Sequence, residues 1–170
     1  MSEMMKPFLA ELEQEMASTR RVLERVPGDK LDWRPHEKSM PLGVLALHTA
    51  TTPQSFANFL QEDSLDKKDV DTRPRELESV DELLPAFDAA MTETQNILSS
   101  WSDEHASGIW KFTDGDKEML AAPRLILFRQ LGLNHWYHHR AQLGVYLRLL
   151  DVPVPAVYGS SADENPFPAA

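Results

Sequence analysis

Apolar residues recur at intervals of three, four and seven positions in four segments of the chain, which is the spacing of amphipathic helices. The expected helices span about residues 4–26, 41–61, 79–101 and 123–150. Turn-forming residues, with proline and glycine among them, separate these segments and are typical of helix ends. The stretch between the second and third helices, residues 62–78, is charged and favours a long surface connection. The pattern therefore predicts a mainly helical chain.

One short segment before the last helix lacks the helical spacing. Residues 110–113 alternate between apolar and polar side chains, Asp114 and Gly115 form a turn dipeptide, and residues 117–120 can return alongside. We expect a short hairpin or a loop here. The tail, residues 152–170, shows no period and contains several prolines, so an irregular segment is expected there.

Four amphipathic helices with one long connection favour an all-α four-helix bundle, with the short hairpin or loop placed before the last helix. The chain has 170 residues, so a single domain over residues 1–170 is the natural expectation. Apolar residues make up 42% and charged residues 26%, as in ordinary globular proteins. No run of eighteen apolar residues exists, so we expect no membrane-spanning helix.

Charge and residue usage argue against several classes of function. The net charge of −10 disfavours nucleic-acid binding, because affinity for phosphate backbones requires concentrated Lys and Arg. The absence of cysteine removes disulfides, thiolate nucleophiles and sulfur metal ligands together. Residues 1–6 lack the basic start and apolar stretch of a secretory signal. These features fit a cytoplasmic protein in which any metal is held by nitrogen and oxygen.

The histidines are the most informative side chains. His135 and His139 are four positions apart in the last expected helix, so both lie on one face and could bind one metal ion. They share this stripe with Phe128, Leu131 and Leu149, which indicates that the face points inward.

A third histidine, His48, lies alone on the apolar face of the second expected helix. Three neutral imidazoles with one open coordination position are typical of a catalytic metal site and not of a closed structural one. The plainer alternative is that His48 is a hydrogen-bonded core residue and that the pair in the last helix arises by chance. The metal hypothesis therefore depends on whether the fold brings the three imidazoles together.

The residues around the histidines narrow the kind of site. Trp136 occupies the position at which the zinc-protease motif has its general-base glutamate, so that motif is absent. Asn134 and Gln142 are candidates for hydrogen bonds to the metal ligands, and Trp33 and Tyr137 are candidates for the walls of a substrate pocket. Each also has a plainer role, as a helix-capping or solvated amide or as a packing aromatic.

Several segments resemble the DinB-like superfamily, which includes the YfiT-like proteins regarded as metal-dependent enzymes. Residues 134–142, Asn-His-x-x-x-His-Arg-Ala-Gln, resemble its NHxxxHRGQ signature, with Ala141 in place of the usual glycine. Residues 40–48 resemble the segment that carries its first ligand, and residues 33–35 resemble the lead-in to that segment. Pro153 matches the usual ending of the last helix. The resemblance covers nearly the whole chain.

The resemblance implies a four-helix bundle of the DinB/YfiT-like type, often a homodimer. It also implies a divalent metal, most often zinc or nickel, bound by His48, His135 and His139. Family members with assigned activities include thiol-dependent S-transferases and a thiol-dependent isomerase. No general base is fixed by the motif. Arg140 could anchor an anionic substrate, although pairing with an acidic surface residue is its expected role.

Two functions from different classes follow. The first is a divalent-metal-dependent enzyme, a hydrolase or a small-thiol S-transferase, that acts on a small-molecule substrate with a low-molecular-weight thiol as a candidate cosubstrate. An open three-histidine site suits both reactions, because a bound metal acidifies a water or a thiol. The second is a non-catalytic, dimeric metal-binding or stress-response module. Metal content and a substrate screen would separate them.

Overall fold

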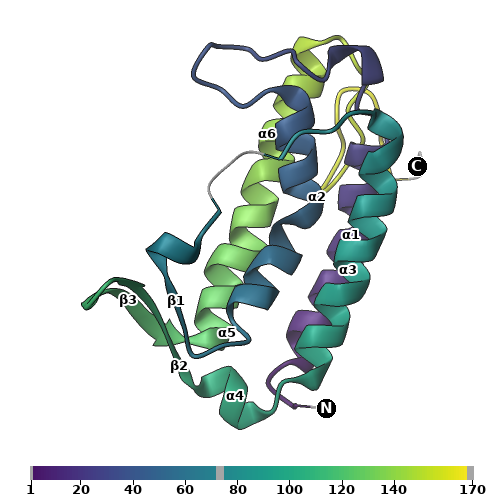
Figure 1. Cartoon of the computed structure of the whole chain (residues 1–170). Coiled ribbons are helices and arrows are strands. Elements are labelled where there is room, and N and C mark those ends of the chain that lie inside the picture. Colours follow the sequence, from purple (N-terminus) through teal and green to yellow (C-terminus); the bar gives the residue numbers. More distant parts are fainter. Residues whose placement is uncertain (1, 72–74, 168–170) are drawn as a thin grey trace.

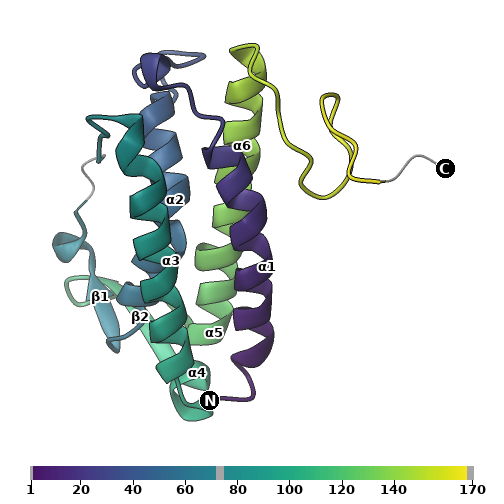
Figure 2. The same ribbon diagram turned by 90° about the vertical axis from the view of Figure 1, so that its right-hand side faces the viewer.

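Four long helices lie side by side in the part of the chain that the computed structural model describes, residues 2–71 and 75–167 (Figures 1 and 2). They are α1 (Lys6–Leu23), α2 (Leu42–Phe59), α3 (Leu83–Ser100) and α6 (His135–Leu149). Helix α2 packs against both α3 and α6, and α1 packs against α3 and α6. None of the described helices is both long and apolar enough to cross a lipid bilayer.

The core is formed by the apolar stripes of these helices. Its largest fully buried side chains include Leu12 of α1, Leu45 of α2, Phe87 of α3 and Trp136 of α6. Helix α2 lies in the middle of the packing, and most of its residues are buried around its whole circumference. Burial of so many apolar side chains is the main favourable contribution to folding. The position of α2 also explains how a histidine of this helix comes to face α6.

The last expected helix, residues 123–150, is interrupted. Helix α5 (Arg124–Leu127) leads into a π-helical segment (Phe128–Asn134), and α6 begins at His135. Gly132 lies within this segment, where a Cβ atom would approach the ring of Phe128 to 2.8 Å. A π-helical turn contains an extra residue, so side chains before and after it no longer follow one α-helical stripe.

The inward stripe that the sequence predicts is also only partly correct within α6, which is a regular α-helix from His135 to Leu149. Leu149, expected to face inward, is 56% exposed. The buried positions of α6 are instead Trp136, His139, Arg140, Leu143 and Leu147. His139 belongs to this buried set, whereas His135 is half-buried.

The expectation of an all-α chain is wrong in one respect, because the protein also contains a small sheet. The strands are β1 (Ser64–Asp66), β2 (Ile109–Asp114) and β3 (Lys117–Pro123), in the order β1-β2-β3. Strands β2 and β3 form the antiparallel hairpin that was one of the two alternatives for this segment, and Gly115 adopts a positive φ of 59° in its turn. Glycine adopts this conformation without steric penalty.

Strand β1 lies inside the charged stretch that favoured a surface connection, and it pairs in parallel with β2. Its three residues are too few for an alternation of polar and apolar side chains to be recognised. A side-chain network holds it instead, because the carboxylate of Asp66 accepts hydrogen bonds from Thr113 Oγ1 at 3.2 Å and from the Gly115 amide at 3.1 Å. Such contacts between distant segments leave no periodic signal in the sequence.

Two short elements flank α3. Ser79 caps a 3₁₀ turn (Val80–Glu82) by accepting a hydrogen bond from the Asp81 amide at 3.2 Å, so the expected start of the third helix is a separate turn before α3. Helix α4 (Asp103–Ser107), which the sequence pattern did not predict, is capped by Ser102.

Beyond α6 the chain is irregular up to residue 167, as expected, and Figure 2 shows this segment looping away from the long helices.

Candidate metal centre

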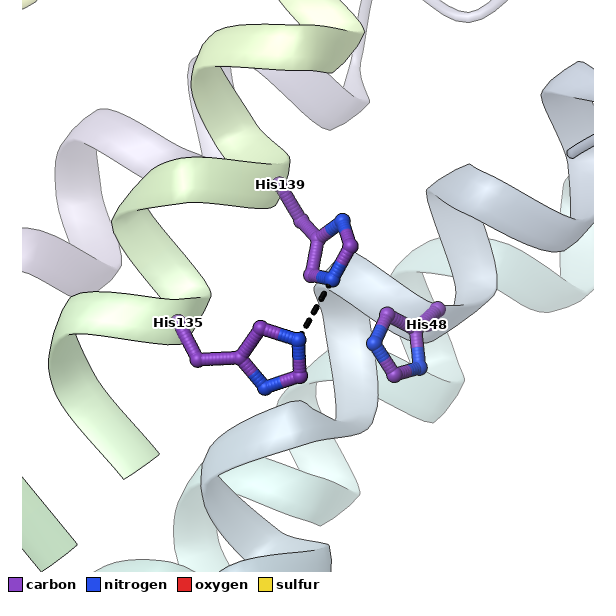
Figure 3. A group of neighbouring side chains, drawn as sticks. All are labelled: His48, His135 and His139. Carbon is purple, nitrogen blue, oxygen red and sulfur yellow. Dashed lines mark hydrogen bonds between the residues drawn. The ribbon is translucent and has the colours of Figure 1, made fainter. Parts of the chain in front are cut away.

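Three histidine side chains from two helices meet beside the core. His48 comes from the middle of α2, and His135 and His139 come from the first two turns of α6. One nitrogen from each ring can be chosen so that all three lie within 4.8 Å of one another. Figure 3 shows the three rings pointing toward a common space. The fold thus brings together three imidazoles that are separated by up to 91 positions in the sequence (139 minus 48).

The closest nitrogen atoms belong to the pair on α6. His135 Nε2 and His139 Nε2 are 2.6 Å apart. The ring of His48 lies edge-on to both partners, with centroid distances of 5.4 Å to His135 and 4.4 Å to His139. Two nitrogen atoms this close cannot both carry a proton, so at least one of them presents a lone pair to its neighbour.

Burial keeps the three imidazoles neutral. His139 is buried, and His48 and His135 are half-buried. Burial is the largest cause that lowers the pKa of each ring, and for His139 the pKa falls to about 4. The neighbouring imidazoles act in the same direction, because a positive charge on one disfavours a charge on the next. Neutral imidazole is the form that binds metal ions.

A glutamine fixes the orientation of one ring. His139 Nδ1 and Gln142 Oε1 are 2.8 Å apart. The amide oxygen can only accept, so this contact places the proton of His139 on Nδ1 and leaves the Nε2 lone pair facing the other histidines. Gln142 thus contacts one of the three histidines, and its role beside a bound metal stays a prediction.

His135 is held differently. Its Nδ1 atom is buried without a hydrogen-bond partner, and its ring packs against Phe56, with centroids 5.8 Å apart. The Leu131 backbone raises the pKa of His135, against the larger effect of burial. Packing against Phe56 and the contact of Nε2 with His139 therefore set the direction of this ring.

The donor set fits a divalent transition-metal ion. The group consists of three nitrogen donors and contains neither sulfur nor carboxylate. Three neutral imidazoles suit zinc, nickel or copper, whereas magnesium and calcium prefer oxygen ligands. The partial exposure of His48 and His135 leaves one side of the group open.

The other expected site residues do not join the histidines. Asn134 is exposed and makes no side-chain cap at the start of α6. Trp33 packs edge-on against Tyr146, with ring centroids 5.6 Å apart. Tyr146 lies about two helical turns beyond His139 on α6, so Trp33 is distant from the histidines. Tyr137 points toward α1, where its hydroxyl donates to Glu11 Oε1 at 2.8 Å.

Sequence reasoning also misplaced Arg140. We expected it to pair with an acidic surface residue, but it is buried and pairs with the buried Glu15 of α1, with 2.6 Å between Nη1 and Oε2. A signal was present in the sequence, because Glu15 lies between Leu12 and Thr19 on the core-facing stripe of the first helix. A carboxylate at such a position requires a buried partner.

Comparisons with known proteins agree with this architecture. The family model described as "DinB family" matches residues 1–166. A DinB-like protein from Bacillus cereus ATCC 10987 superposes with a TM-score of 0.69 at 24% identity and covers 89% of this chain and 95% of that one. The DinB-like protein YjoA from Bacillus subtilis gives a TM-score of 0.69 at 20% identity, with coverages of 89% and 97%. At these identities the likeness establishes the fold.

One match lies in a larger protein. A phosphopentomutase from Idiomarina loihiensis is 34% identical over 103 residues, which is 58% of this chain. The match spans only 25% of that protein. Its activity is therefore that of a much longer chain, and the match gives no indication of the reaction at the histidine group.

Proposed function

The chain belongs to the DinB family, and we propose that it is a metal-dependent enzyme that binds one divalent ion through His48, His135 and His139. The four long helices would then form the bundle of that family. Zinc and nickel are the proposed metals. The reaction class is hydrolysis or the transfer of a small thiol to an electrophilic small molecule.

One observation carries the proposal: three neutral imidazoles from two different helices converge within 4.8 Å. Burial lowers the pKa of each ring, so protons compete less for the nitrogen atoms at neutral pH. A core histidine normally satisfies its ring nitrogens with hydrogen bonds to oxygen atoms, whereas His135 and His139 face each other. When bound, a divalent ion with an open position would acidify a water or a thiol.

The surrounding residues have supporting roles in this proposal. Gln142 keeps the proton of His139 on Nδ1 and thereby aims Nε2 at the shared space. Phe56 covers one side of His135 and excludes water from that side. Thr52 donates from Oγ1 to the carbonyl of His48 at 2.6 Å, which keeps the polar side chain inside α2 satisfied.

Metal analysis of protein purified without chelators or a histidine tag tests the site. We expect about one equivalent of zinc or nickel in the wild type and a large loss in His48→Ala and His139→Ala. His36→Ala is the matched control, because His36 is exposed and its ring nitrogen accepts a hydrogen bond from the nearby Lys38 amide. Metal that persists at wild-type stoichiometry in both triad variants would refute the proposal, as would wild-type protein that takes up no ion.

The reaction class needs a separate screen. Metal-loaded protein would be incubated with small thiols and electrophiles, and with ester and amide substrates, beside the His48→Ala variant. Turnover that depends on His48 supports an enzyme. Metal binding without any turnover would favour the non-catalytic module, an alternative that also fits a histidine group without a carboxylate to act as base. The homodimer and the cytoplasmic location stay predictions.

A further inference from the structure

A second candidate site lies on the other side of α6. A cavity of about 400 Å³, partly open to solvent, is lined by α6, by Val22 near the end of α1, and by Val154, Val157 and Tyr158 of the C-terminal strap, which we define as residues 152–167. The α6 residues that line it, Tyr137, Arg140, Ala141, Gly144, Val145, Arg148 and Leu149, centre about half a turn away from His135 and His139. The cavity is therefore separate from the histidine group.

Exposed apolar side chains gather around this cavity. Val145 is 59% exposed, Leu149 is 56% exposed and Tyr158 is 72% exposed, and all three line it together with the aliphatic Val154 and Val157. Apolar surface concentrated in a concave site is typical of a ligand-binding pocket, and the volume is in the range of such pockets. The lining therefore favours a ligand with an aliphatic or aromatic body.

The charges of the lining differ from those of the whole chain. Acidic residues outnumber basic ones in the sequence, 27 to 17, yet the described charged residues that line the cavity are two arginines, Arg140 and Arg148. Arg140 is committed to the buried Glu15. Arg148 pairs with Asp163 of the strap, and both side chains are partly exposed, so this ion pair contributes little and can be exchanged. Arg148 is thus the available cation.

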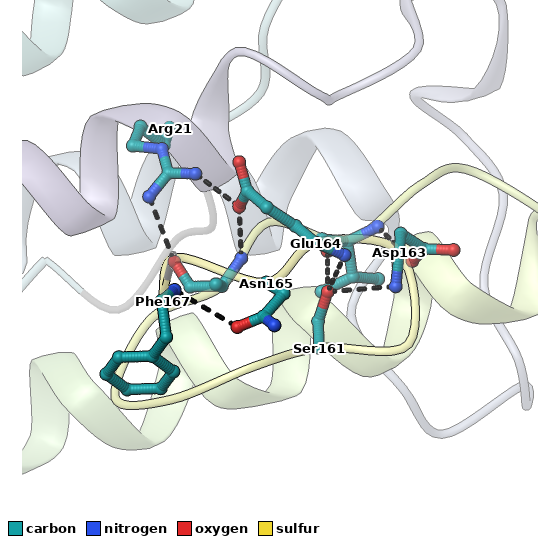
Figure 4. A network of polar contacts seen from close by, with 8 residues as sticks. Arg21, Ser161, Asp163, Glu164, Asn165 and Phe167 are labelled. Atoms are coloured by element: carbon teal, nitrogen blue, oxygen red, sulfur yellow. Dashed lines mark hydrogen bonds and ion pairs between the residues drawn. The ribbon is translucent and has the colours of Figure 1, made fainter. Parts of the chain in front are cut away.

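The strap wall is held in place by polar contacts (Figure 4). Arg21 of α1 pairs with the carboxylate of Glu164 and donates to the Ala156 carbonyl at 3.0 Å. Ser161 Oγ donates to the Val154 carbonyl at 2.7 Å and accepts from the Glu164 amide at 2.9 Å. A wall fixed by such contacts reduces the entropy lost when a ligand binds.

We propose that this cavity binds a small amphiphilic carboxylate, with its apolar chain or ring against α6 and the strap and its carboxylate on Arg148. The shape favours this occupant over a second copy of the chain, because the apolar residues line a hollow and not a flat face. The site requires no metal and does not depend on the proposed enzyme activity.

Octanoate is the test ligand, and ¹H–¹⁵N correlation spectra of the full chain are the readout. We expect saturable shifts at Gly144, Ala141 and Val157, with a dissociation constant of about 1 mM for so small a ligand. Gly144→Leu should fill the cavity and abolish these shifts. Gly144→Ala is the matched control, because its Cβ would meet only Val154 Cγ1, at an ordinary 3.8 Å.

Further variants test the contact of the carboxylate with Arg148 and the alternative that a second copy of the chain covers this surface. Arg148→Gln should weaken octanoate about tenfold and leave octanol binding unchanged, since only the carboxylate uses the cation. Ala141→Met is a second cavity-filling variant for the case in which Gly144→Leu does not fold. Absence of saturable shifts, or shifts that persist in the filled variants, would overturn the proposal. So would concentration-dependent broadening of these signals without octanoate, which would assign the surface to a second copy.

Discussion

Replacement of Arg140 by methionine tests the buried contact between α1 and α6. Arg140 and Glu15 have only 3% and 9% of their side-chain surfaces exposed, and Arg140 also donates to Thr19 Oγ1 at 3.1 Å. In R140M the carboxylate of Glu15 loses its cation in a poorly hydrated position. It keeps one side-chain donor, the hydroxyl of Tyr158, at 2.9 Å.

The size of the effect follows from this geometry. Removal of one partner from a buried ion pair costs about 3–5 kcal/mol, because an uncompensated charge stays buried. Because the carboxylate keeps the hydrogen bond from Tyr158, we expect a loss of unfolding free energy near the lower end of this range, about 3 kcal/mol. For a chain of this length, that loss corresponds to a decrease in Tm of about 6–12 °C.

Urea unfolding followed by circular dichroism measures the loss. Arg148→Met is the control, because its ion pair with Asp163 is partly exposed and should contribute less than about 1 kcal/mol. The double variant Glu15→Leu/Arg140→Met should be more stable than R140M, since it removes both buried charges. If the unfolding free energy of R140M lies within about 1 kcal/mol of the wild-type value, the ion pair is hydrated and the reasoning is wrong.

Three more predictions concern the histidine group and the segment before it. Gln142→Leu should weaken zinc binding about tenfold in a competition titration, whereas Gln14→Leu, a change of an exposed glutamine, should not. Equal zinc affinities of Gln142→Leu and the wild type would contradict the proposed role of the amide. Gly132→Ala should lower the unfolding free energy by about 1–3 kcal/mol, because its Cβ would lie 2.8 Å from an aromatic ring, whereas Gly144→Ala should be tolerated. Burial lowers the pKa of His139 to about 4, below its unfolded value of about 6.5. The metal-free protein should therefore lose stability as the pH falls from about 6.5 toward 4, and urea midpoints should fall less steeply in His139→Ala; parallel slopes would contradict this assignment.

The features that the sequence predicts correctly are those with a local signal, either a period or a turn motif. The spacing of apolar residues located the four long helices, and the separation of four between His135 and His139 placed them on one face. The turn dipeptide at Asp114 and Gly115 indicated the hairpin that the structure contains. Each of these signals is local, so one chain is enough to show it.

The features that the sequence does not predict depend on single residues or on distant contacts. A π-helical turn adds one residue to a helix, and the apolar pattern of residues 123–150 tolerates this change of phase. Strand β1 depends on the side chain of Asp66, which bonds residues almost fifty positions away. The pair of Arg140 with Glu15 is an intermediate case, because the place of Glu15 on the core-facing stripe indicates a buried partner but does not say which residue it is.

Helix α6 combines these points, because three of its faces have different surroundings. His135 and His139 face α2, the apolar Leu143 and Leu147 are buried in the core, and Gly144 faces the cavity under the strap. A change of phase in the π-helical segment would rotate all three faces together and separate the histidine pair from His48. The rotation that turns the histidine pair toward His48 is therefore also the one that buries Leu143 and Leu147 and leaves Leu149 exposed, so the packing of the core and the histidine group support each other.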